Sequence, residues 1–368
     1  MIRSRHHRLA CLLATAGVVG MLAPSVTADE ADAALAKYKK PIDQSLEKAL
    51  AYLAKTQHKE GYWPSGLGKS TAVSSLAVMA FLAKGYTPGT GPYGKQIDRG
   101  IDFVLRTQRR NGLLCPGGNQ RGPMYSHGIS ALMLSEVSGM VDKARQERID
   151  KALPHAIRLI LTAQQVRKSG VHKGGWRYQA HSADSDISLT GWSLMALRSA
   201  RNNGSPVPDK AIADAVGFVL RCRAKAHARP AVKGKPAPGV GFAYQPGQAP
   251  GMARTGTAVL CLELCGKHRC KEALDGGDWI LAHPVRHFGA SYFYYGLYYC
   301  SQGMFQLGGK HWQQFAPHMY EMMLKFQRKD GSWPQAAGGE AQAGACYATA
   351  MGVLAVSVSY RQLPIYQR

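Results

Sequence analysis

A two-part pattern of hydrophobic positions recurs six times along the chain. The first part is amphipathic, and in its first copy the apolar residues fall on one face of a helix, at Ile42, Leu46, Leu50 and Leu53. A polar turn follows, which contains glycine and usually comes after a glutamine. The second part is a run of small and apolar residues without a polar face, as in STAVSSLAVMAFLAKG from Ser70. The pattern predicts six helix pairs, each with one half-exposed helix and one buried helix.

The six copies follow one another along the chain, which is typical of a repeat architecture. The ends of the amphipathic helices and their turns are expected at residues 50–63, 103–114, 159–178, 218–245, 279–283 and 322–333. The buried helices begin near Ser70, Tyr125, Ser188, Arg254, Ser291 and Ala345. An open stack of pairs would expose two ends that need caps, whereas a closed ring needs none. We therefore predict an all-α fold, a single (α/α)6 toroid whose six helix pairs form two concentric rings.

One domain is expected to hold the whole repeat. The toroid is predicted over residues 42–361, preceded by a linker at residues 29–41 and followed by a C-terminal tail at residues 362–368. Residues 221–240 read RCRAKAHARPAVKGKPAPGV, and we interpret this stretch as a basic loop insertion within the toroid.

The first 28 residues have the composition of an export signal. Three arginines between residues 3 and 8 precede an apolar run at residues 9–23, and small residues at Val26 and Ala28 fit cleavage after Ala28. The apolar run is short for a membrane span. We expect an exported protein, periplasmic or extracellular, with an uncleaved anchor as the alternative.

The formal net charge is +23, and removal of the three leader arginines lowers it to +20. A field of this sign favours anionic partners, such as an anionic membrane surface or an acidic polysaccharide. The basic residues are scattered outside the insertion, and no nucleic-acid-binding motif accompanies them, so a nucleic-acid partner is not expected.

Seven cysteines remain beyond the leader, at irregular spacing. Cys261, Cys265, His268 and Cys270 lie within one short stretch, but no second CxxC or HxxxH pair completes a zinc site. We therefore expect no metal and no cofactor here, and instead a Cys265–Cys270 disulfide or buried thiols.

Two of the polar turns carry a family resemblance. Gln57, Gly61 and Trp63, and likewise residues 327–333, match the Q-x3-G-x-W repeat of squalene–hopene and oxidosqualene cyclases. The stretches DSDISLTGW, YFYYGLYY and SYRQLPIY resemble exported bacterial members of this prenyltransferase/squalene-oxidase-repeat group. The resemblance covers residues 42–360 and implies the α/α toroid of terpenoid cyclases.

The resemblance also implies a candidate acid. Class II terpene cyclases protonate an alkene with the middle Asp of a D-x-D-D motif, and here the motif reads Asp184-Ser185-Asp186-Ile187. By position, Asp186 would be the acid and Asp184 its partner, while Ile187 departs from the motif. His127, near the start of another buried helix, is a candidate to tune Asp186. Structural roles compete with these assignments, because Asp186 suits a helix N-cap and a buried histidine suits a hydrogen-bonded core position.

The N-termini of the buried helices are predicted to meet at one mouth of the ring, where unpaired N–H groups and partial positive charge gather. Arg254 lies there and suits an anionic group, although a structural ion pair with Asp184 or Asp186 is the alternative. The remaining candidate ligand-binding residues are aromatic, able to offer ring faces or hydroxyl donors: Trp192, Tyr292, Tyr294, Tyr295 and Tyr347.

Other chemistries lack their residues in this sequence. The chain has neither the D-x-C zinc motif of protein prenyltransferases nor a DDxxD motif for magnesium and diphosphate. The expected function is acid-initiated cyclisation or isomerisation of an isoprenoid or related lipid, with a hydrophobic small molecule as partner. The alternative is a non-catalytic or glycan-active exported toroid that binds a polysaccharide, lipid or protein.

Overall fold

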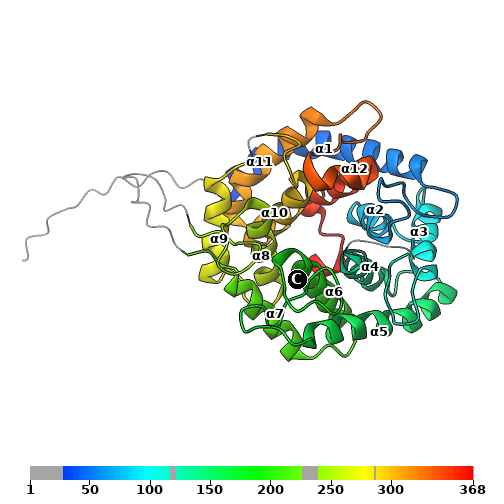
Figure 1. Cartoon of the computed structure of the whole chain (residues 1–368). Coiled ribbons are helices and arrows are strands. Elements are labelled where there is room, and N and C mark those ends of the chain that lie inside the picture. Colours follow the sequence, from blue (N-terminus) through cyan, green and yellow to red (C-terminus); the bar gives the residue numbers. More distant parts are fainter. Residues whose placement is uncertain (1–27, 117–121, 226–238, 286, 368) are drawn as a thin grey trace, which may run out of the picture.

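The computed structural model describes residues 28–116, 122–225, 239–285 and 287–367, and helices dominate this part of the chain (Figure 1). The outer helices are α1 (Ala28–Thr56), α3 (Gly94–Arg106), α5 (Lys143–Gln165), α7 (Asp209–Arg221), α9 (Lys271–Ala282) and α11 (Gly309–Phe326). The inner helices are α2 (Thr71–Ala83), α4 (Pro123–Val137), α6 (Ile187–Asn202), α8 (Met252–Leu264), α10 (Phe293–Leu307) and α12 (Gly344–Val356). Three short 3-10 helices complete the described elements: η1 (Gly338–Ala343), η2 (Val358–Tyr360) and η3 (Pro364–Tyr366).

The twelve α-helices of the described residues form two concentric rings (Figure 1). Each inner helix contacts the inner helix of the next repeat, and α12 contacts α2, so the inner ring closes. In the outer ring α1 contacts α11, so the first and last repeats meet there as well. The predicted (α/α)6 toroid is confirmed.

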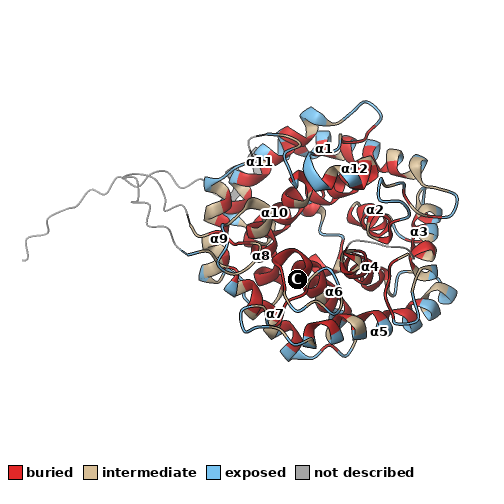
Figure 2. Ribbon diagram, in the orientation of Figure 1, coloured by how far each residue is buried: buried red, intermediate tan, exposed pale blue. Residues whose placement is uncertain are grey.

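Burial follows the predicted division between the two rings (Figure 2). The apolar face of α1 is buried, with Ile42 3% exposed and Leu46, Leu50 and Leu53 at 0%. In α2 every residue except Ala72 is buried. The inner helices therefore pack on both sides, which explains why their sequences show no polar face.

The glutamine of each well-formed turn joins two outer helices. In the first turn the Gln57 side-chain amide donates to the carbonyl oxygens of Gly61, at 3.0 Å, and of Gln96 in α3, at 2.9 Å. The same two-way arrangement occurs at Gln108, Gln164 and Gln327. One amide therefore holds its own turn and the next outer helix together.

The glycine of the turn allows a close approach between backbones. Gly174 has φ +89°, and a Cβ added there would lie 2.1 Å from the carbonyl oxygen of Asp214 in α7. The tryptophan that follows is buried, and the Trp176 indole N–H donates to the Ile160 carbonyl oxygen of α5 at 2.8 Å. This glycine can therefore carry no side chain without displacing the neighbouring helix.

The C-terminal residues differ from the predicted tail. Leu363, Ile365 and Tyr366 are 4–5% exposed, and the C-terminal end of the chain lies inside the ring (Figure 1). The Ile365 N–H donates to the Glu136 carboxylate at 3.1 Å, and the Tyr366 hydroxyl contacts that of Tyr298. These residues close the end of the ring opposite the inner-helix N-termini, and burial there removes their apolar side chains from water.

The N-terminal residues also differ from the prediction, since residues 29–41 belong to α1 rather than to a linker. Tyr38 is 6% exposed and its ring lies 5.4 Å from that of Tyr320 in α11. The stretch is rich in alanine, which favours helix, and its packing on α11 explains why the helix starts early. The signal peptide before Ala28 and most of the basic insertion lie outside the described residues.

Five of the seven cysteines in the described residues are buried, and no disulfide joins Cys265 to Cys270, so buried thiols are found and the Cys265–Cys270 disulfide is not. No metal-binding group of His, Cys, Asp and Glu occurs in the described ranges. None of the helices described combines the length and hydropathy needed to cross a bilayer.

The turn glycine gives a test of the ring's construction. We expect Gly174→Ala to lower the free energy of unfolding by at least about 3 kcal/mol, because a left-handed backbone and a clash with α7 both oppose the methyl group. Urea unfolding followed by circular dichroism measures the change.

Gly204→Ala is the matched control. Gly204 has φ +82°, but a Cβ there would meet nothing within 4 Å. The expected loss is about 1 to 2 kcal/mol, from backbone strain alone. Equal losses at the two positions would contradict the role of the close approach.

Candidate functional site

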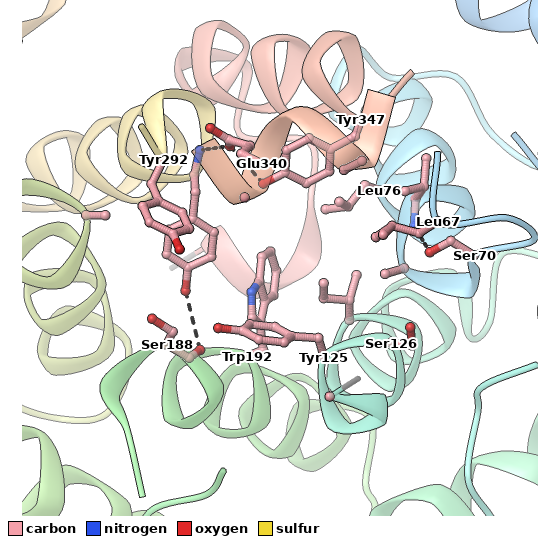
Figure 3. Close-up of a pocket in the computed structure, with 18 of the residues that line it drawn as sticks. Leu67, Ser70, Leu76, Tyr125, Ser126, Ser188, Trp192, Tyr292, Glu340 and Tyr347 are labelled. Atoms are coloured by element: carbon pink, nitrogen blue, oxygen red, sulfur yellow. Dashed lines mark hydrogen bonds between the residues drawn. The ribbon is translucent and has the colours of Figure 1, made fainter. Parts of the chain in front are cut away.

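A cavity of about 510 Å³ opens where the six inner helices begin. Every inner helix contributes to its wall from its first two turns (Figure 3). The convergence of inner-helix N-termini predicted from the sequence is therefore observed. Because these side chains come from six distant segments, only closure of the ring brings them together.

The wall has an apolar side and an aromatic side. Leu67, Val73 and Leu76 of the first repeat and Ile129 of α4 form the apolar side. The aromatic side carries the indole of one tryptophan and the rings of six tyrosines: Trp192, Tyr125, Tyr178, Tyr244, Tyr292, Tyr295 and Tyr347. A cavity built this way suits a molecule with a hydrocarbon body and polar or charged groups.

Glu340 is the one carboxylic acid among the described residues of the wall. It belongs to η1 and is 7% exposed. Its oxygens accept hydrogen bonds from the N–H groups of Tyr294, at 3.2 Å, and Tyr295, at 2.8 Å, and from the Tyr347 hydroxyl, at 3.0 Å. Glu340 therefore accepts hydrogen bonds from N–H groups that would otherwise be unpaired at the N-terminus of α10, a helix of another repeat.

Burial raises the pKa of Glu340 above its ordinary value, while the three donors oppose this shift. All three donors bond to the ionised form, so we expect a carboxylate at neutral pH. Sequence reasoning missed Glu340, whose only local signal is an acid after two glycines in the segment before a buried helix.

Tyr292 lies at the mouth of the cavity with a strained backbone. Its φ is +58° and its ψ is +34°, a left-handed conformation that bulky residues rarely adopt, and its side chain is 57% exposed. The carboxylate of Glu340 holds the next turn of the chain through Tyr294 and Tyr295. Strain of this kind gathers at binding sites, which supports a ligand role for Tyr292.

Arg254 also lines the cavity, but it makes no ion pair with either candidate aspartate. Its guanidinium donates to the Ala249 carbonyl oxygen at 3.2 Å and lies 5.8 Å from the centre of the Tyr244 ring. The cation that pairs with both aspartates is Arg177, which sequence reasoning missed. The predicted ion pair of Arg254 with Asp184 or Asp186 is therefore not found, and its role toward an anionic group stays a prediction.

Asp184 and Asp186 lie outside the cavity wall. One Asp186 oxygen accepts the N–H groups of Ser188 and Leu189, both at 2.9 Å, which is an N-cap on α6. The other lies 3.1 Å from the Arg177 guanidinium. Burial raises the pKa of Asp186 to about 6, against the opposing effect of these donors. Asp184, half exposed, pairs with Arg177 at 3.2 Å.

His127 occupies a repeat position rather than a site position. Its Nδ1 accepts the Leu114 N–H at 3.1 Å, and its Nε2 donates to the Ala156 carbonyl oxygen at 3.1 Å. The corresponding backbone N–H groups of other turns bond to hydroxyls of their inner helices: Ser74, Thr190, Thr255 and Thr349. His127 is fully buried and absent from the wall, and burial lowers its pKa to about 4.

Five of the six predicted ligand-binding residues therefore meet at the wall: Trp192, Arg254, Tyr292, Tyr295 and Tyr347. Tyr294 does not, because its side chain is fully buried and its hydroxyl donates to the Pro334 carbonyl oxygen at 2.6 Å. The three predicted catalytic residues stand elsewhere. Adjacent residues of an α-helix point in different directions. The sequence YFYYGLYY does not show which of its tyrosines point into the cavity.

Comparisons with solved structures show the same kind of fold. A glycosidase in complex with glucose superposes with TM-score 0.55 over 92% of this chain and 100% of that chain, at 13% identity. The GH76 α-mannanase of Bacteroides thetaiotaomicron gives TM-score 0.56 over 87% and 96%, at 9% identity. A type II terpene cyclase from Scytonema with bound geranylgeranyl dihydroxybenzoate gives 0.36 over 89% and 100%, at 12% identity. No family model and no curated protein matches the chain.

The glycosidase and the mannanase place the fold among the α/α toroids, and at such low identity they show the fold alone. The activity has to be argued from the cavity itself.

His127 gives a pH-dependent test of its structural role. The fold holds the imidazole neutral, with a pKa of about 4 against about 6.5 in the unfolded chain. Its contribution to stability is therefore fully present above pH 6.5 and is lost as the pH falls toward 4. Between pH 7 and 4.5 we expect this residue to cost about 2.5 kcal/mol of unfolding free energy.

The comparison uses His127→Thr, since threonine serves the same bond in three other repeats. Unfolding in urea is measured for both proteins at pH 7 and pH 4.5. At pH 7 the variant is the less stable protein, by about 1 to 3 kcal/mol, because the Ala156 carbonyl loses its donor. The difference in unfolding free energy between the two proteins should shrink by about 2.5 kcal/mol at pH 4.5. A difference that stays the same at both pH values would contradict a neutral buried imidazole.

Proposed function

We propose that the protein binds a largely hydrophobic small molecule, of the isoprenoid kind, in the cavity of the toroid. The observation that carries the proposal is the composition of the wall, in which an apolar side faces rings of tyrosine and tryptophan. The volume of about 510 Å³ falls within the range of small-molecule sites. The repeat resemblance to terpenoid cyclases supports the same class of ligand.

Binding is supported better than cyclisation. An acid that protonates an alkene has to contact the substrate and carry the proton. Asp186 lies outside the wall and both of its oxygens are occupied by N–H donors. Glu340 lies at the wall, but its three donors favour the carboxylate. We therefore propose a binding protein that acts outside the cytoplasm, as the leader sequence suggests.

Carbohydrate binding is the second candidate, because a wall rich in tyrosine rings and hydroxyls also suits a sugar. Glycoside hydrolysis is supported less, since it uses two carboxyl groups on either side of the scissile bond. In the described part of the wall Glu340 stands alone as a carboxylic acid.

The proposal is tested by filling the cavity. Ala72 lines the wall and is partly exposed, so Ala72→Trp should reduce the space for a ligand while the helix still forms. Lipid extraction and native mass spectrometry of the protein from its exported fraction should show a hydrophobic molecule bound to the wild type. We expect the variant to retain less than about a tenth of it, which corresponds to a loss of about 1.4 kcal/mol or more.

Ala51→Trp places the same side chain on the exposed surface of α1 and serves as control. It should retain the ligand, and Asp186→Asn should retain it as well, because neither residue touches the wall. A bound acidic glycan instead of a lipid would favour the second candidate. An equal ligand content in the Ala72 variant and the wild type would overturn the cavity as the binding site.

A further inference from the structure

The carboxylate of Glu340 has no basic partner among the residues that the structure describes. Its hydrogen-bond donors are two backbone N–H groups and one hydroxyl, all of them neutral. The side chain is 93% hidden from solvent, yet it borders the cavity. A buried carboxylate usually has a cation beside it, and here the space where one could stand is the cavity itself.

Aromatic side chains line the cavity that this carboxylate borders. The Tyr347 hydroxyl bonds to it directly, and Tyr292 stands at the start of the turn that it caps (Figure 3). The Tyr295 N–H is one of its donors. Trp192 continues the wall, 6.5 Å from the Tyr295 ring, and its indole stacks on Tyr298 behind it at 5.5 Å. Aromatic faces attract cations through their quadrupole, and more strongly where water is excluded.

The positive group of the wall stands on another helix. Arg254 belongs to α8, and no ion pair links it to Glu340 in the described residues. Its guanidinium is engaged by the Ala249 carbonyl oxygen and the Tyr244 ring. The two charges therefore leave one negative and one positive region in the wall. The Tyr244 ring is engaged by Arg254, whereas the Tyr347 hydroxyl bonds to Glu340.

We propose that the cavity selects a ligand with a cationic group, a quaternary ammonium or protonated amine, which sits against Glu340 and the rings of Tyr292, Tyr295, Tyr347 and Trp192. This inference rests on the proposed function, because the hydrocarbon part of the same ligand occupies the apolar side. It adds the charge of the headgroup, which neither the fold nor the repeat motif specifies.

Three ligands with one chain length and different charge test the proposal. They are decyltrimethylammonium, decanoate and 1-decanol, each below its aggregation concentration. Each is titrated into the full exported chain, and binding is followed by calorimetry and by tryptophan fluorescence. The wild type should bind decyltrimethylammonium at least about tenfold more tightly than decanoate. Decanol, which is neutral, should bind with intermediate affinity.

Glu340→Gln removes the charge and keeps the shape and one acceptor. It should lower the affinity for decyltrimethylammonium about tenfold and change the affinity for decanol less than about twofold. Tyr347→Phe is the matched control, since it removes one donor and keeps both the ring and the carboxylate, and its effect on the ammonium ligand should stay below about threefold. Unchanged decanol binding shows that each variant keeps the folded cavity.

The outcomes separate the two proposals. Decanol binding together with tighter binding of decanoate than of the ammonium ligand would overturn the cationic headgroup and leave the hydrophobic cavity standing. The cationic headgroup would also be overturned if Glu340→Gln left the affinity for the ammonium ligand unchanged. Binding of none of the three ligands would overturn both proposals. The comparison of ligands on the wild type needs no variant, so it decides the question even where Glu340→Gln destabilises the fold.

Discussion

The toroid depends on one hydrogen-bonding arrangement, the glutamine amide that donates to its own turn and to the next outer helix. Each such amide donates both of its N–H groups to backbone carbonyl oxygens, one in its own turn and one in the neighbouring outer helix. At Gln327 the second acceptor is the Ser45 carbonyl oxygen of α1, at 2.8 Å, almost the whole chain away. The same short-range motif that links neighbouring repeats thus also joins the last repeat to the first.

Closure of the ring creates both ends of the lumen. At one end the inner-helix N-termini surround a cavity, and at the other the C-terminal residues fill the space. Tyr366 contacts Tyr298, and Tyr298 stacks on Trp192, so the filled end supports a ring that lines the cavity. The C-terminal segment, which lies outside the six helix pairs, therefore supports the floor of the site from below.

Comparing equivalent positions in the repeats separates structural residues from candidate ligand residues. His127 replaces a hydroxyl that other inner helices use to accept a backbone N–H, and the bond itself is retained. Glu340 has no such counterpart among the described turns, since it caps α10 from η1 rather than its own helix. Tyr292 likewise keeps a left-handed backbone where the inner helices of other repeats begin with ordinary conformations or glycine. Glu340 and Tyr292, whose arrangement has no equivalent in the other described repeats, both line the cavity.

The sequence by itself determined the helices, their pairing and the ring. The periodic hydrophobic pattern and the turn motif are local properties, and they recur in each repeat. It also determined that Trp192, Arg254, Tyr292, Tyr295 and Tyr347 would meet, since helix N-termini in such a ring point to one mouth. Only the tertiary structure decided which side each side chain faces and which distant group it meets. Tyr294 points away from its neighbours, Asp186 is held by Arg177, and Glu340 reaches another repeat, because these contacts depend on the packing of helices far apart in the chain.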